Sequence, residues 1–167
     1  MAASARRSST AWRLANLYLG SVGAELLGEE EPVIVGFSEE TRCFVSTDYF
    51  RQGGDRFADF VLHETAHVFH NCKRRTVGLP ESRRREWLLD IDFRKRETFA
   101  YACEAYGRIL ELGRRPADRR ALLSELLAGP PPPDDRVDED DYRAALTEAV
   151  VARNGWKRIL RWCRPRR

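Results

Sequence analysis

Lysine, histidine and long apolar runs are scarce in this sequence, and no internal repeat is visible. Only three of the 29 Lys and Arg residues are lysines, and the net charge is only +3. The molecule as a whole is therefore not strongly polycationic, and nucleic acid is not its expected partner. No apolar run approaches 18 residues, so we expect no membrane-spanning helix. With 167 residues, 43% of them hydrophobic, the chain suits one domain with a modest core.

The four cysteines are scattered, and none belongs to a C-x-x-C pair. This spacing argues against a disulfide framework and is typical of reduced thiols, so we expect a cytoplasmic protein. Arg6 and Arg7 resemble the start of a twin-arginine signal, but Arg13 interrupts the stretch that follows and no clear cleavage site is present. Cys72 and Cys103 are alternatives as soft zinc ligands, although such cysteines are more often small core residues.

A His-Glu-Thr-Ala-His stretch at residues 63–67 is the strongest functional motif. On a helix, His63 and His67 lie one turn apart on the same side, where two imidazoles can bind one Zn²⁺ at about 2.0–2.1 Å each. Glu64 projects roughly 100° round the helix from His63, so it can lie beside the metal and take a proton from the attacking water. The alternative is an amphipathic helix whose histidines are polar surface residues.

The residues around the motif favour a helix packed into the core. Asp55 is the candidate N-cap of this helix. Apolar residues recur at helical spacing on both sides of the motif, namely Phe57, Phe60, Val61, Val68 and Phe69. We therefore expect an apolar surface on the motif helix, which would place the site on a buried helix.

A third ligand is expected on a later helix. Glu97, Ala100, Tyr101 and Glu104 share one face of a predicted helix that begins near residue 96. Ala100 is small enough for a close approach to the motif helix, so Glu97 can complete a His-His-Glu site for one Zn²⁺ per chain. Glu104 suits the role of hydrogen-bond acceptor for a ligand histidine. The alternative for either glutamate is a solvated helix face.

His70, Asp90 and Asp92 are further candidates. His70 lies three residues after His67 and shares its face. Ligands at i, i+4 and i+7 spread over about 10 Å along a straight helix, too far for one ion. We therefore expect His70 to support the site or to contact substrate. Asp90 and Asp92 are alternative ligands or hydrogen-bond partners of the site.

The HETAH motif followed by ETFAYACEAY resembles the gluzincin metallopeptidases, in particular the lethal-factor-like and MtfA-type peptidases, over about residues 56–110. The resemblance implies that the glutamate of E-x-F-A, here Glu97, is the third zinc ligand and that Glu64 is the general base. It also implies a minimal zincin-like core in which a strand before the active-site helix lines the substrate cleft.

The chain departs from these families at one position. The relatives place a tyrosine that stabilises the transition state about two turns before the glutamate ligand, but Asp90 occupies that position and residues 71–96 contain no tyrosine. Tyr101 is our candidate for stabilising the oxyanion, and Tyr106, Tyr49 or an arginine are alternatives.

Hydrophobic periodicity and turn residues predict a mainly helical chain with one hairpin. Together with the resemblance, this implies an α+β fold with a small antiparallel sheet or hairpin packed on the motif helix. The predicted strands cover residues 33–37 and 42–46, and the other predicted helices cover residues 10–27, 96–112, 116–128, 139–153 and 156–162. The first helix is expected to bury Trp12, Leu14, Leu17, Tyr18, Val22, Leu26 and Leu27. We place a zincin-like metallopeptidase core at residues 1–128. A proline spacer and a C-terminal helical hairpin, packed on the same domain, follow at residues 129–167.

These observations predict a zinc metalloendopeptidase that hydrolyses peptide bonds of a restricted protein substrate, because so small a chain has few elements for broad substrate recognition. The competing hypothesis is a weakly active or inactive zincin-like module that binds a protein or nucleic-acid partner, which the missing tyrosine favours. A third is a nucleic-acid-binding protein with a coincidental motif, which would use the basic stretch 73–85. The sequence does not indicate an oligomeric state.

Overall fold

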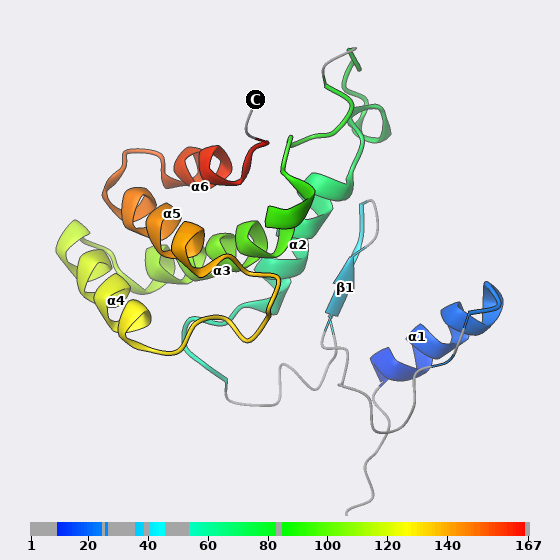
Figure 1. Cartoon of the computed structure of the whole chain (residues 1–167), viewed down its shortest axis with the longest axis horizontal. Coiled ribbons are helices and arrows are strands. Elements are labelled where there is room, and N and C mark those ends of the chain that lie inside the picture. The colour runs from blue at the N-terminus through cyan, green and yellow to red at the C-terminus, as the bar shows by residue number, and fades with distance from the viewer. Residues whose placement is uncertain are drawn as a thin grey trace, which may run out of the picture.

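A computed structural model describes residues 10–24, 26, 36–38, 41–45, 54–82 and 85–165. Within these residues the protein is mainly helical (Figure 1). The elements are α1 (Thr10–Ser21), β1 (Gly36–Ser38), β2 (Cys43–Val45), α2 (Phe60–Asn71), the 3-10 helices η2 (Arg74–Val77) and η3 (Phe93–Lys95), α3 (Arg96–Leu112), α4 (Pro116–Ala128), α5 (Glu139–Val151) and α6 (Gly155–Cys163). No described helix is both long enough and apolar enough to cross a membrane.

Helix α3 lies in the middle of the helical part (Figure 1) and contacts α2, α4, α5 and α6. Three of its alanines, Ala100, Ala102 and Ala105, are at most 3% exposed, so neighbouring helices can approach its backbone closely. The helix has the predicted bounds, and it ends where the Gly113 N–H donates to the Ile109 carbonyl.

The last three helices form the core on one side of α3. Helix α4 has the predicted bounds, and its Leu122 and Leu123 are buried. Helix α5 ends at Val151, two residues earlier than the predicted position 153, because Ala152 is already extended. The Asn154 side chain caps α6 by accepting the Lys157 N–H. Both α5 and α6 contact α3, so residues beyond the proline spacer share the core with the helix that carries Glu97.

The motif helix α2 begins later than its predicted cap. Asp59, not Asp55, is the N-cap, because its side chain accepts the Leu62 N–H at 3.0 Å. Asp55 instead accepts the Phe57 N–H in the turn before the helix. Capping by Asp59 satisfies one of the free N–H groups in the first turn of α2.

The predicted apolar surface of α2 is buried only in part. Val61 is 40% exposed and Phe69 is 48% exposed. The buried residues of this helix are His63, Glu64, Ala66 and His70. Helix α2 thus turns its motif side inward, where partners on α3 can satisfy the polar groups, and leaves part of its apolar side exposed.

The first helix is shorter and more exposed than predicted. Helix α1 ends at Ser21, and Gly23 beyond it has a φ of 69°, which a right-handed helix does not allow. The predicted buried side is wrong where it is described, because Leu17, Tyr18, Val22 and Leu26 are 56–70% exposed. The side chains of Trp12 and Leu14, and all of Leu27, lie outside the described residues.

The two strands pair in antiparallel register, with Phe37 opposite Phe44, and both contact α2. Strand β1 reaches one residue further than predicted, to Ser38, whereas residues 33–35 and 46 of the predicted strands lie outside the described residues. Ser38 is the last residue of β1, so the hairpin brings a hydroxyl next to the motif helix.

Two local ion pairs lie in the basic stretch between α2 and α3. Lys73 pairs with Glu86 at 2.6 Å, and Arg75 pairs with Glu81 at 3.8 Å. Arg74 donates to the Pro80 carbonyl at 2.8 Å. Residues 83–84 lie outside the described residues. Lys73 and Arg75 are therefore held by carboxylates of the same stretch.

Candidate metal centre

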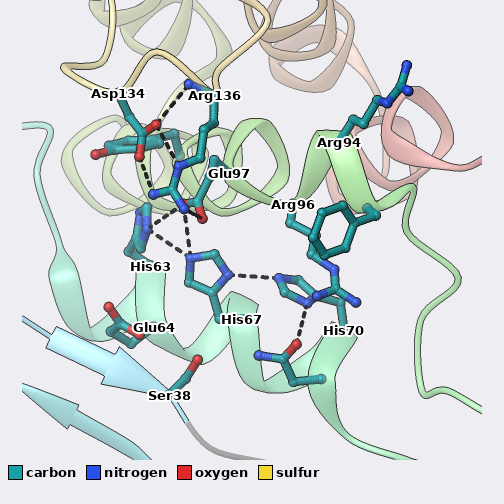
Figure 2. Close-up of a pocket in the computed structure, with 13 residues that line it drawn as sticks. Ser38, His63, Glu64, His67, His70, Arg94, Arg96, Glu97, Asp134 and Arg136 are labelled. Carbon is teal, nitrogen blue, oxygen red and sulfur yellow. Dashed lines mark hydrogen bonds and ion pairs between the residues drawn. The ribbon is translucent and has the colours of Figure 1, made fainter. Parts of the chain in front are cut away.

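His63, His67 and Glu97 converge at the contact between α2 and α3 (Figure 2). The Nε2 atoms of the two histidines lie 3.1 Å apart, and Glu97 Oε2 lies 3.3 Å from His67 Nε2 and 3.6 Å from His63 Nε2. A tetrahedral ion at about 2.0–2.1 Å from each ligand separates its ligand atoms by roughly 3.3–3.4 Å. The three donor atoms therefore fit one metal ion, and the ligand types suit zinc.

The other ring nitrogen of His63 is held by Glu104. Nδ1 of His63 donates to Glu104 Oε2 at 3.1 Å, and the Asp59 N–H donates to Glu104 Oε1 at 2.5 Å. Glu104 is only 4% exposed, so its carboxylate depends on these donors for stabilisation. It occupies the acceptor role expected from the sequence, and it fixes Nε2 of His63 toward the metal group.

A different partner holds the other ring nitrogen of His67. Nδ1 of His67 lies 2.8 Å from His70 Nε2, and His70 Nδ1 lies 3.1 Å from Asn71 Oδ1 (Figure 2). One set of tautomers satisfies both contacts, with each histidine donating through Nδ1. Burial, with smaller contributions from His67 and Arg96, lowers the pKa of His70 to about 4, so its Nε2 is free to accept. His70 thus supports a ligand and is not one of the three converging donors.

The second oxygen of Glu97 contacts the loop between α4 and α5. Arg136 Nη1 lies 3.1 Å from Glu97 Oε1. Asp134 holds the same guanidinium through Nε at 2.9 Å and Nη2 at 2.6 Å. Burial raises the pKa of Glu97, but hydrogen bonds with His63 and His67 and the charge of Arg136 lower it well below its ordinary range. Glu97 is therefore ionised, and its Oε2 faces the histidines.

Sequence reasoning missed Asp134 and Arg136. Arg136 is the one basic residue between Asp134 and Asp141. A single cation inside an acidic run was the available signal that it forms specific ion pairs.

In the metal-free protein, the contacts of His63 with Glu104 and Glu97 raise its pKa. Burial alone lowers the pKa of His63, but hydrogen bonds to Glu104 and Glu97 more than reverse this effect and raise the pKa to about 9. His63 is thus protonated at neutral pH, at the point where the three metal-binding donors converge. Any cation that binds there must displace this proton.

Glu64 and Tyr101 line the same cavity as the metal group. Burial raises the pKa of Glu64, while His67, His63 and a hydrogen bond from Ser38 oppose that rise. The ring of Tyr101 stands edge-on to that of His63 with 4.4 Å between centroids. Burial, with neighbouring carboxylates, raises the pKa of Tyr101 to about 12, so the phenol keeps its proton and can donate it in a hydrogen bond.

The other candidates lie elsewhere. Tyr106 packs in the core against Trp156 with 4.8 Å between ring centroids, and Tyr49 lies outside the described residues. The interpretation of the cysteines as core residues is confirmed for Cys72 and Cys103, which are 0% and 6% exposed.

Neither aspartate that precedes α3 reaches the metal group. Asp90 is exposed. The Asp92 side chain caps η3 through the Arg94 N–H, and its own N–H donates to the Cys163 carbonyl. The alternative ligands Asp90 and Asp92 are therefore not part of the converging group.

A cavity of about 780 Å³ opens over the metal group. Its walls come from β1, α2, the η3–α3 junction and the loop at Asp134 and Arg136. This volume is within the range of small-ligand sites, roughly 300–1,000 Å³. The arrangement therefore combines three metal-binding donors, a nearby carboxylate and space for a ligand.

Comparison of the chain with protein-family models, with curated proteins and with solved structures finds no match. The interpretation of this site consequently depends on its own geometry.

Proposed function

We propose that this protein is a zinc-dependent metallopeptidase of the zincin type. The observation that carries the proposal is the convergence of His63, His67 and Glu97 on one point, with Glu64 lining the same cavity. The resemblance of the two motifs to gluzincins supports the same assignment. The hairpin that contacts α2 fits the small antiparallel element that such a minimal α+β domain requires.

The proposed roles follow from the positions of the side chains. His63, His67 and Glu97 hold Zn²⁺, which when bound supplies Lewis-acid polarisation of the scissile carbonyl and activation of water. Glu64 accepts a proton from the attacking water and delivers it to the leaving amine, a role that its raised pKa favours. Tyr101 donates a hydrogen bond to the oxyanion, in place of the tyrosine that the related families carry near position 90.

The substrate is proposed to be a peptide segment in extended conformation. Strand β1 ends at Ser38, which lines the cavity next to Glu64. Among the described residues β1 pairs only with β2, so its other edge can accept main-chain hydrogen bonds from a peptide. The modest cavity favours a restricted substrate.

Two variants test this function in one experiment. Glu64→Gln is expected to bind zinc at one equivalent per chain and to lose peptide hydrolysis, because the amide cannot accept the proton. Glu97→Ala is expected to lose most of its zinc, and Glu111→Ala, at the exposed far end of the same helix, serves as the control. Zinc content is measured by elemental analysis, and hydrolysis with a degenerate fluorogenic peptide library. Full hydrolysis by Glu64→Gln would refute the mechanism.

A second candidate is a zinc-binding module that holds a protein partner without cleaving it. The presence of Asp90 where the related families carry tyrosine favours this candidate. Zinc binding at one equivalent in a wild-type protein that cleaves no peptide in the library would select it.

A further inference from the structure

Arg96 extends the candidate site beyond the metal group. It is the first residue of α3 and lines the same cavity. Figure 2 shows its side chain beside His70, so that His63, His67, His70 and Arg96 follow one another across the cavity. The cavity therefore carries the metal-binding donors at one end and a guanidinium at the other.

The Arg96 side chain lacks an anionic partner. Its Nε atom is buried and has no hydrogen-bond partner, and no carboxylate in the described part of the chain forms an ion pair with it. Two neighbouring cations differ, since Lys95 pairs with Asp141 and Arg136 pairs with Glu97. A guanidinium in the wall of a cavity, with no carboxylate paired to it, can bind an anionic group of a ligand.

Phe93 and Asn71 line the cavity together with Arg96. Its guanidinium carbon lies over the Phe93 ring, 4.7 Å from the ring centre, so the aromatic ring adjoins the cation on one side. Phe93 is 75% exposed and thus contributes little to the core. Asn71 lines the same end of the cavity, and its Oδ1 accepts from His70, which leaves its NH₂ group as a further donor.

We propose that Arg96, assisted by Asn71, forms a subsite that binds a carboxylate of the peptide substrate. The two terminal nitrogens of a guanidinium present parallel N–H groups, which match the two oxygens of a carboxylate. The inference rests on the proposed function in that the carboxylate belongs to a bound peptide. The two sources of such a group are an aspartate or glutamate side chain and the C-terminal carboxylate.

Binding to the zinc-loaded Glu64→Gln protein separates recognition from cleavage. The probes are labelled, end-blocked hexapeptide mixtures with glutamate or glutamine fixed at one position in turn, and neutral mixtures with a free or an amidated C-terminus. Fluorescence anisotropy is expected to show at least about tenfold tighter binding of one carboxylate series than of its neutral match. That series identifies the source of the carboxylate.

Second substitutions in the same protein assign the preference to Arg96. Arg96→Gln is expected to reduce the preference to within about twofold, and Arg96→Lys, which keeps the charge but loses the paired donors, to an intermediate value. Arg120→Gln removes the same charge from exposed α4 and is expected to leave the preference intact. Should Arg96→Gln fail to fold, as judged by thermal unfolding, the comparison of Arg96→Lys with its parent decides.

The outcomes separate this inference from the proposed function. If the carboxylate preference depends on Arg96 but the wild-type protein, which retains Glu64, cleaves no peptide, the subsite is supported and the peptidase proposal is contradicted. Hydrolysis by the Glu64 protein without any preference for a carboxylate contradicts the subsite and leaves the peptidase standing. A carboxylate preference that Arg96→Gln retains in full also overturns the assignment.

Discussion

The two histidines of the candidate metal group are supported in different ways. His63 donates to the carboxylate of Glu104, whereas His67 donates to the imidazole of His70. The His63 side is anchored between two helices, because Glu104 belongs to α3. The His67 side is built within α2 alone, since His70 and Asn71 follow in the same helix.

This difference concerns charge as well as position. A carboxylate acceptor strengthens the basicity of the histidine that donates to it, which agrees with the pKa of about 9 for His63. His70 is neutral near pH 7, because its pKa is lowered to about 4. The metal group therefore has one anionic and one neutral support, and their contributions to metal affinity should differ.

The largest effect is expected from Glu104→Gln. This substitution removes the negative charge beside His63 while keeping an oxygen for the Asp59 N–H. Loss of such a partner costs roughly 10–100-fold in metal affinity, and we expect the upper part of this range because the lost group is charged. Competition with a chromogenic zinc chelator measures the affinity.

Glu111→Gln, on the exposed end of α3, is the matched control and should bind zinc like the wild type. Unchanged affinity in a folded Glu104→Gln protein would show that the carboxylate does not support the metal group.

The protonation of His63 predicts opposite pH trends for zinc affinity and for the stability of the metal-free protein. Because the folded-state pKa of His63 is raised from 6.5 to about 9, its contribution to stability is complete below pH 6.5. The contribution is lost as the pH rises through about 9. Zinc must displace the same proton, so its affinity should increase by up to about tenfold per pH unit over this window.

Urea unfolding of the metal-free protein and chelator competition measure the two trends. In Glu104→Gln the pH trends of stability and of zinc affinity should both shift to lower pH, because loss of the carboxylate lowers the pKa of His63. Parallel trends, with stability and affinity increasing together, would contradict the assignment of the proton to His63.

Local sequence signals were sufficient for much of the fold. Gly113 and Pro116 separate α3 from α4, and both helices have the predicted bounds. The spacing of His63 and His67 on one helix face, with Glu97 at the start of another, was also enough to predict which side chains converge. Helical periodicity and terminal residues act over a few residues, so they can be read directly from the chain.

Other features depend on contacts that the sequence does not encode locally. Asp55 and Asp59 are equally suitable caps by residue type, and the one that caps α2 is Asp59, whose own N–H donates to Glu104 on α3. The contact of Arg136 with Glu97 requires the loop after α4 to return to the start of α3. Leu17 and Tyr18 of α1 are exposed, which shows that periodicity predicts an apolar side and not what covers it.

The smallest effect is expected from His70→Leu. The substitution fills a similar buried volume and removes the neutral acceptor of His67 Nδ1. No charge is lost, and His70 belongs to the same helix as the His67 that it supports. Zinc affinity should therefore fall by no more than about tenfold, the lower part of the range for such partners. The chelator competition used for Glu104→Gln gives the direct comparison, with thermal unfolding as the test of folding. A loss as large as that for Glu104→Gln would mean that the two histidines are supported equally, and that the charge of Glu104 does not set the strength of the site.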